Sequence, residues 1–320
     1  MEYYIAFWNV ENLFDVVNSP RRSDKLQRTL GRELSGWTEA RLGRKIGQLA
    51  SVIRKMNDGS GPDLLGVCEV ENDHVLQRLA TACALPGRNY QVAHHDMSDN
   101  RGIDVAFLYD ADRFSAELTF SHYVVKRTAT RDLFQVNFRS AAGNLLVVIG
   151  NHWPSRMGGR YETEPYRIMA GETLAYFHER IRQIHGTDVA VLAMGDFNDQ
   201  PSDRALTNYA LSHHMRAKVT RARSPKFLNL TWATMGSGQG THYHENSAAV
   251  LDQLLVSKGL LTGNSGFMAL TDTVEIVRFP EMTATGTYPV PIRFGRGAGS
   301  NRDGFSDHFP IAMRLREKVA

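Results

Sequence analysis

The chain has 320 residues, of which 42% are hydrophobic and 22% are charged, and its formal net charge is +3. This length fits one large domain or two small ones, and the composition is that of a globular protein rather than a disordered or fibrous one. The mild positive charge tolerates a polyanionic ligand without requiring one.

Apolar runs of strand length alternate with helical patterns along the chain. We expect helices over 38–56, beginning at an N-cap Thr38, over 71–84, and over 161–184, ending at Gly186. This alternation favours an α/β fold with mixed sheets. The expected strands are 3–9, 64–68, 103–109, 133–138, 145–150, 188–194, 251–256 and 309–315.

The chain shows no internal repeat and no low-complexity linker, so we expect a single domain over 1–320. Long loops are expected over 16–37, 212–247 and 278–305. Because long loops in compact domains are often functional, we expect these three to surround the functional site.

Cysteine content and the N-terminal sequence bear on the cellular compartment. Cys68 and Cys83 are too few for a disulfide framework and lack the spacing of a zinc site, so we expect reduced core thiols. Met1-Glu2-Tyr3-Tyr4 has neither the basic region nor the apolar stretch of a signal peptide. No apolar run approaches the ~20 residues of a membrane-spanning helix. We therefore expect a cytoplasmic protein without a transmembrane segment.

Two motifs in the first quarter of the chain place polar side chains where strands end. Asn9 and Glu11 are two apart, so they point to the same side of the first strand. Together they can hold a cation or its water ligands; alternatively, Asn9 caps a turn and Glu11 is solvated. Glu69 follows a buried run, where its charge needs a partner or a metal, unless it caps the next helix.

The run Gly195-Asp196-Phe197-Asn198-Asp199 is more specific, because it follows a buried strand directly. Asp196 can accept a proton from water, and Asn198 can fix that water or a phosphate oxygen. A purely structural turn does not need Asp and Asn at alternate positions. We therefore interpret this motif as catalytic.

Asn151-His152 follows another buried strand, and Arg156 lies four positions further on. A lone histidine is usually structural, but a nearby serine and arginine are typical of anion binding. We therefore predict that Asn151 and Arg156 help to bind a phosphate beside His152.

A second histidine, His308, lies next to Asp307. Asp252 lies within the apolar run 251–256, where a carboxylate is costly unless it is paired. His308 would be its natural partner, and the pair would belong to the same site.

These motifs resemble the endonuclease/exonuclease/phosphatase superfamily, which includes pancreatic-type deoxyribonucleases, apurinic/apyrimidinic endonucleases, inositol polyphosphate 5-phosphatases and neutral sphingomyelinases. The resemblance extends from Tyr4 to about Arg316, and its most specific parts are the runs 195–198 and 306–308. It implies a four-layered α/β sandwich of two mixed sheets flanked by helices, with the site at one end.

The resemblance also implies a Mg²⁺ or Mn²⁺ cofactor. Glu69 would be the principal metal ligand, with Asn9 and Glu11 nearby and Asp307 close to the metal. Mg²⁺ is typically held by few carboxylates, with water molecules completing its shell, and would stabilise charge on a phosphoryl group.

The remaining roles implied by the resemblance are catalytic. Asp196 would activate the attacking water, Asn198 would help to hold it, and His308, oriented by Asp252, would contact the scissile phosphate. His152 would donate a proton to the leaving oxygen. Shorter matches suggest that Asp104 orients His152 and that Arg131 contacts the phosphate.

The expected activity is hydrolysis of phosphodiester bonds, with a nuclease acting on DNA or RNA favoured and a monomer expected. Basic residues of two long loops would form a track for the nucleic acid backbone, unless they are simply solvated. One alternative is a phosphatase or phosphodiesterase for a small or lipid phosphoester. A non-catalytic binding module is disfavoured because the acidic positions are retained. The basic loop residues are Arg21, Arg22, Lys25, Arg28, Arg293, Arg296 and Arg302.

Overall fold

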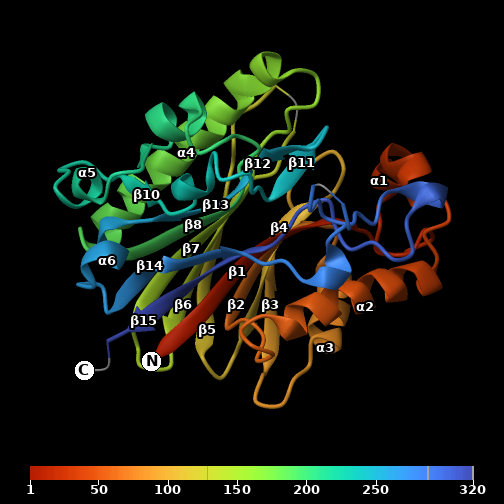
Figure 1. The fold of residues 1–320 in the computed structure, drawn as a ribbon, viewed down its shortest axis with the longest axis horizontal. Helices are drawn as coiled ribbons and strands as arrows, with labels where there is room; N and C mark the ends of the chain where they lie inside the picture. Colours follow the sequence, from red (N-terminus) through yellow and green to blue (C-terminus); the bar gives the residue numbers. More distant parts are fainter. Residues whose placement is uncertain (128, 287, 319–320) are drawn as a thin grey trace.

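The computed structural model describes residues 1–127, 129–286 and 288–318. Two large mixed sheets pack face to face, and helices cover their outer faces, so the molecule has four layers (Figure 1). The expected fold class, a four-layered α/β sandwich, is confirmed.

The first sheet contains strands from both ends of the chain. Strand β1 lies between β2, with which it is parallel, and β15, with which it is antiparallel. The order of the sheet is β14 (Phe267–Ile276), β15 (Ile311–Glu317), β1 (Glu2–Leu13), β2 (Leu64–Val70), β4 (Asp104–Asp110) and β3 (Tyr90–His94).

The second sheet is built from the middle of the chain. Strands β7 and β8 are parallel, and β13 returns antiparallel to β8. The order of the sheet is β5 (Phe114–His122), β6 (Leu133–Ser140), β7 (Leu145–His152), β8 (Ala190–Asp196), β13 (Asp252–Val256), β10 (Phe227–Asn229) and β9 (Ser212–His213).

Alternation along each strand divides the core into layers. In β1, Tyr3, Ile5 and Phe7 belong to the core between the two sheets. The intervening side chains of β1 pack with α2 (Glu39–Lys55) and α3 (Asp73–Ala82), because successive strand residues point to opposite faces. Helix α4 (Arg160–His185) packs on the outer face of the second sheet.

The long loops contain short elements of their own. The two-stranded β11–β12 hairpin lies near the start of β13 (Figure 1). The short elements are α1 (Asp24–Leu30), η1 (Gly31–Leu34), η2 (Ala205–Tyr209), α5 (Arg216–Thr220), η3 (Trp232–Thr234), β11 (His242–His244), β12 (Ser247–Ala249), α6 (Lys258–Thr262), η4 (Pro280–Met282) and η5 (Gly297–Gly299).

All eight expected strands and all three expected helices correspond to elements of the structure. Thr38 caps α2 by accepting the N–H of Arg41, and Gly186 ends α4. Both cysteines are free and buried, as expected. Among the described helices, none has the length and apolar character that spanning a bilayer requires.

Candidate active site

The strands that carry the predicted site residues end at the same end of the sandwich. Asn9 of β1 lies next to the end of the parallel strand β2, which carries Glu69. In the second sheet, Asp196 ends β8 and pairs with His152 of β7 on one side and Asp252 of β13 on the other. Residues far apart in the sequence are therefore neighbours here.

Asp196 lies at the centre of this group. Its Oδ2 accepts a hydrogen bond from Nδ2 of Asn9 at 3.1 Å, and its Oδ1 accepts one from the N–H of Asn198 at 2.9 Å. Nε2 of His152 and Nε2 of His308 each lie 3.9 Å from Oδ2 of Asp196. Burial is the main cause that raises the pKa of Asp196, to about 7.

The predicted pairing of His308 with Asp252 is present. Nδ1 of His308 lies 2.7 Å from Oδ2 of Asp252, and both side chains are buried. Burial alone would lower the pKa of His308, but the carboxylates of Asp252, Asp196 and Asp307 together raise it well above its usual value. His308 is therefore an imidazolium whose other nitrogen faces the centre of the site.

His152 has a different environment. Its Nε2 lies 3.8 Å from Oε1 of Glu69, whereas its buried Nδ1 has no hydrogen-bond partner among the described residues. Burial, followed by the charges of Arg131 and Arg101, lowers its pKa well below the usual value. His152 is therefore held neutral.

The shorter match suggested that Asp104 orients His152, but no hydrogen bond joins these two side chains among the described residues. Asp104 begins β4 in the first sheet, and its Oδ2 lies 3.0 Å from Nε2 of His94 on the neighbouring strand β3. Burial raises the pKa of Asp104 to about 6. Asp104 pairs with His94 in this structure, and its role in orienting His152 stays a prediction.

Glu69 is held by the backbone beside it. Its Oε2 accepts the N–H of Asn12 at 3.0 Å, which leaves Oε1 directed towards His152. Glu69, Asn12 and Asn198 have φ values of 65°, 58° and 51°. These lie in the left-handed region, which residues other than glycine rarely adopt. Such backbone strain is typical of functional sites.

Glu11 and Asp307 both contact Arg293. Oε1 of Glu11 accepts hydrogen bonds from Arg293 at 2.8 Å and from the N–H of Gly295, and Oε2 accepts the N–H of Phe294. Asp307 is more exposed and lies 3.4 Å from Arg293. Glu11 thus anchors the loop that follows residue 292, and both of its oxygens are occupied.

The three residues predicted to contact the phosphate form hydrogen bonds with other groups of the protein. Asn151 is fully buried, and its Oδ1 accepts a hydrogen bond from Nε1 of Trp153 at 3.0 Å. Nε of Arg156 donates to the carbonyl of Asn198 at 2.7 Å. Arg131 donates to the carbonyls of His152 and Trp153, so its guanidinium spans the turn after β7.

Two residues near the site were not predicted from the sequence. The ring of His242, in the β11–β12 hairpin, lies 4.8 Å from the ring of His308, centroid to centroid. Lys45 is fully buried in α2 and donates to the carbonyl of Phe305. Its place on the apolar side of the helix, three positions after Leu42, was the only available indication that it is buried.

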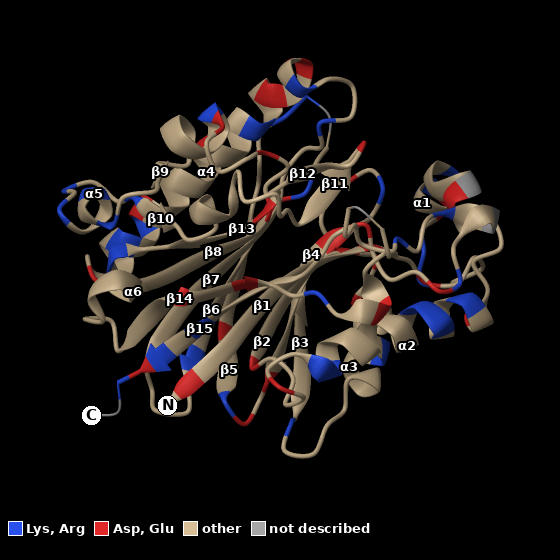
Figure 2. Ribbon diagram, viewed as in Figure 1, with Lys and Arg blue, Asp and Glu red and all other residues tan. Residues whose placement is uncertain are grey.

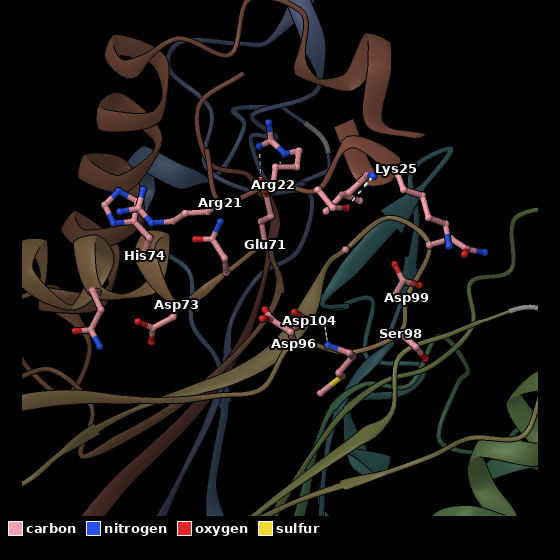
Figure 3. A pocket seen from close by; sticks show the side chains of 17 residues that line it. Arg21, Arg22, Lys25, Glu71, Asp73, His74, Asp96, Ser98, Asp99 and Asp104 are labelled. Atoms are coloured by element: carbon pink, nitrogen blue, oxygen red, sulfur yellow. Dashed lines mark hydrogen bonds and ion pairs between the residues drawn. The ribbon is translucent and has the colours of Figure 1, made fainter. Parts of the chain in front are cut away.

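A cleft of about 730 Å³ lies beside the site and is lined by α1, the start of α3 and the loop before β4 (Figure 3). On its wall, Arg22 forms an ion pair of 2.6 Å with Glu71, and the two side chains are 0% and 1% exposed. Arg21 and Lys25 are exposed at the same cleft. Asp99 links the cleft to the site through its ion pair with Arg131.

Basic residues are not confined to this end of the molecule. Figure 2 shows Lys and Arg along α2, around α5 and near the end of β15, on different sides of the ribbon. Of the predicted track, Arg22 and Arg293 are paired with carboxylates, so the cations left at the cleft are fewer than the sequence suggested.

Comparisons with known proteins agree with this geometry. Residues 4–317 match the Endonuclease/Exonuclease/phosphatase family. No curated protein matches the sequence.

Solved structures with the same fold include three that cover nearly the whole chain. The human Nocturnin catalytic domain with bound sulfate is 14% identical, with a TM-score of 0.55, and the match covers 99% of this chain and 95% of that one. A mannosyl-6-phosphatase from Bacteroides thetaiotaomicron is 15% identical (TM-score 0.57, covering 98% and 99%). Truncated Caenorhabditis elegans TDP2 is 16% identical (TM-score 0.56, covering 98% and 97%).

At these identities the structural likeness establishes the fold, whereas the match over residues 4–317 establishes the family. The family consists of phosphoesterases that generally depend on a divalent metal, and Asp196, Asp252 and His308 form a buried cluster with spacing that suits an ion. The chain belongs to the endonuclease/exonuclease/phosphatase family.

Proposed function

We propose that this protein is a divalent-metal-dependent phosphodiesterase that acts on nucleic acid. The observation that supports this most directly is the convergence on Asp196. An amide nitrogen of Asn9 lies 3.1 Å from its Oδ2, and two imidazole nitrogens lie 3.9 Å from the same atom. A carboxylate between two histidines can both orient a water and face a phosphoryl group.

Asp196 is the proposed acceptor of the water proton. Its pKa of about 7 suits a group that must take up a proton during turnover at neutral pH. The N–H of Asn198 and the amide of Asn9 each donate to one of its oxygens, so its orientation is fixed before substrate arrives. Pre-positioning of this kind lowers the entropic barrier to attack.

His308 supplies fixed positive charge to the phosphoryl oxygens. It stays protonated because Asp252 accepts a hydrogen bond from its Nδ1, which leaves Nε2–H free to donate to the phosphate. Donors that are already aimed at developing charge need no reorganisation during the reaction. His152, held neutral, offers a hydrogen bond to the leaving oxygen rather than an easily transferred proton.

The residues present fit a divalent cation. Oε1 of Glu69 faces the site 3.8 Å from Nε2 of His152, and among the described residues none donates a hydrogen bond to it. Glu69, Asn9 and Asp307 are the proposed residues that would hold Mg²⁺ or Mn²⁺, and all three offer the oxygen atoms that such hard ions prefer. When bound, the cation would stabilise negative charge on the phosphoryl oxygens.

Nucleic acid is the proposed substrate because Arg21 and Lys25 remain exposed at the cleft beside the site. Exposed cations there can meet phosphates that flank the scissile one. A phosphatase for a small phosphoester is the second candidate. It is favoured by the pairing of Arg22 and Arg293, which shortens the basic track, and by the fold shared with a mannosyl-6-phosphatase.

A substrate panel separates these candidates. The protein would be incubated with Mg²⁺, Mn²⁺ or EDTA and with plasmid DNA, single-stranded DNA, RNA, bis-p-nitrophenyl phosphate or sugar phosphates. We expect metal-dependent cleavage of nucleic acid and of the synthetic diester. Cleavage of sugar phosphates alone would establish the second candidate, and equal activity in EDTA would refute metal dependence. The Glu69→Gln variant should lose most activity while its melting temperature is retained.

A further inference from the structure

We propose that His242 is a specificity-determining residue that hydrogen-bonds the nucleoside attached to the scissile phosphate. This inference depends on the proposed function and adds to it a contact outside the catalytic set. It starts from the β11–β12 hairpin, which the sequence showed only as part of a loop rich in glycine, serine and histidine.

The hairpin is tied to both halves of the His308–Asp252 pair. Oγ1 of Thr241 accepts the backbone N–H of Asp252 at 3.1 Å, and the carbonyl of Thr241 accepts the N–H of Phe309 at 2.7 Å. The residue before His242 is therefore fixed to the residue after His308 and to Asp252 itself. The position of His242 relative to the active site is as well defined as that of His308.

His242 packs directly on the histidine that faces the phosphate. It forms an isolated β-bridge with His308, and the two rings are tilted by 45° with their centroids 4.8 Å apart. His308 is 6% exposed, whereas His242 is half-buried, so His242 presents an accessible edge beside the buried ring. A group esterified to a phosphate held by His308 would lie within reach of that edge.

The environment keeps His242 uncharged. Burial, followed by the positive charge of His308 and those of Arg293 and Arg156, lowers its pKa to about 3. A neutral imidazole carries one N–H donor and one acceptor nitrogen, which suits hydroxyl and carbonyl groups of a nucleoside. His242 would add little to the binding of the phosphate, because the positively charged His308 already binds that group.

The alternative is that His242 only packs against His308 and holds it in place. The variant His242→Phe separates the two roles, because it keeps an aromatic ring on His308 and removes both polar atoms. The variant His242→Gln keeps a donor and an acceptor without the ring. His244→Phe, at an exposed position of the same strand, is the matched control.

The test uses two esters with the same leaving group: thymidine 5′-(p-nitrophenyl phosphate) and bis-p-nitrophenyl phosphate. We expect His242→Phe to lower kcat/KM for the nucleoside ester by roughly 3- to 10-fold, the usual effect of one neutral hydrogen bond, and to leave the second ester within about 2-fold. His242→Gln should recover most of the loss. Equal losses on both esters would show that the ring only supports His308, and no loss on either would exclude the contact.

A binding measurement keeps the inference testable even if the wild-type protein hydrolyses neither small ester. By calorimetry, wild-type protein should bind thymidine 5′-monophosphate more tightly than inorganic phosphate, and His242→Phe should remove most of the difference. Equal affinities of the wild type for the two ligands would overturn the inference by itself.

Discussion

The active centre and the adjacent cleft differ in how their charged groups are partnered. In the centre, His308 and Asp252 are 2.7 Å apart with side chains 7% and 0% exposed, and each charge faces a fixed partner. At the cleft, Arg21 of the loop after β1 and Lys25 of α1 are both exposed (Figure 3). Buried, paired groups supply defined geometry for chemistry, whereas exposed groups supply adaptable contacts for recognition.

The largest effect should come from the centre. Asp196→Asn should reduce kcat by about 10³- to 10⁴-fold, the upper part of the range for a lost general base, with a much smaller change in KM. His308→Ala should cause a loss of similar order, and the double variant should lose far less than the product of the two, because both act on one transition state. Steady-state kinetics on bis-p-nitrophenyl phosphate would measure this, with exposed Asp112→Asn as the control. Multiplicative losses would show that the two residues act independently.

Substitutions in the wall of the cleft should change the stability of the protein rather than its catalytic rate. Arg22→Ala leaves Glu71 buried without its partner, which typically costs about 3–5 kcal/mol, so the free energy of unfolding should fall strongly. Arg21→Ala, the exposed neighbour, should change it by less than about 0.5 kcal/mol. Urea unfolding would compare the two variants. Similar values for both would mean that the Arg22–Glu71 pair contributes nothing to the fold.

A third change tests the charge of His308. Asp252→Asn removes the strongest influence that raises the pKa of this histidine, so the pKa should fall. A group with a raised pKa remains active below that pKa and loses its proton as the pH rises through it. The alkaline limb of the kcat/KM profile should therefore move to lower pH, with about a 10²-fold loss at pH 8. If the alkaline limb did not move, it would report the titration of a group other than His308.

The smallest effect should come from the exposed cations. The double variant Arg21→Ala/Lys25→Ala should weaken DNA binding by roughly 10-fold at low salt and lower the slope of log affinity against log salt by about 1.8, if both residues contact phosphates. Hydrolysis of bis-p-nitrophenyl phosphate should not change. An unchanged slope would show that these charges are merely solvated and would favour the small-substrate phosphatase.

Much of the fold could be predicted because its central strands are apolar and end in polar motifs. β7 and β8 are buried along almost their whole length, so their hydrophobic runs were clear. β5 is exposed over most of its residues, and β14 is only partly buried, because each lies at the edge of its sheet. Such strands carry mixed side chains that periodicity does not distinguish from loops.

The site was predictable where a strand end or the chemistry of a buried side chain indicated it, and not where the docking of a loop determined it. Asp252 and His308 were paired correctly because a buried carboxylate requires a partner. Asp104 was expected to orient His152, whereas its side chain pairs with His94 on the neighbouring strand. His242 depends on a hairpin whose docking is set by tertiary contacts, which no local pattern encodes.

The place of β1 between β2 and β15 has a consequence for biosynthesis. Ala6 pairs with Ala312, so β1 leaves the ribosome long before β15, the strand that covers its second edge. Until then, the nascent chain exposes a long unpaired strand edge, a recognised hazard for intermolecular association. His308 lies just before β15, so the active site is also incomplete until this segment has been translated.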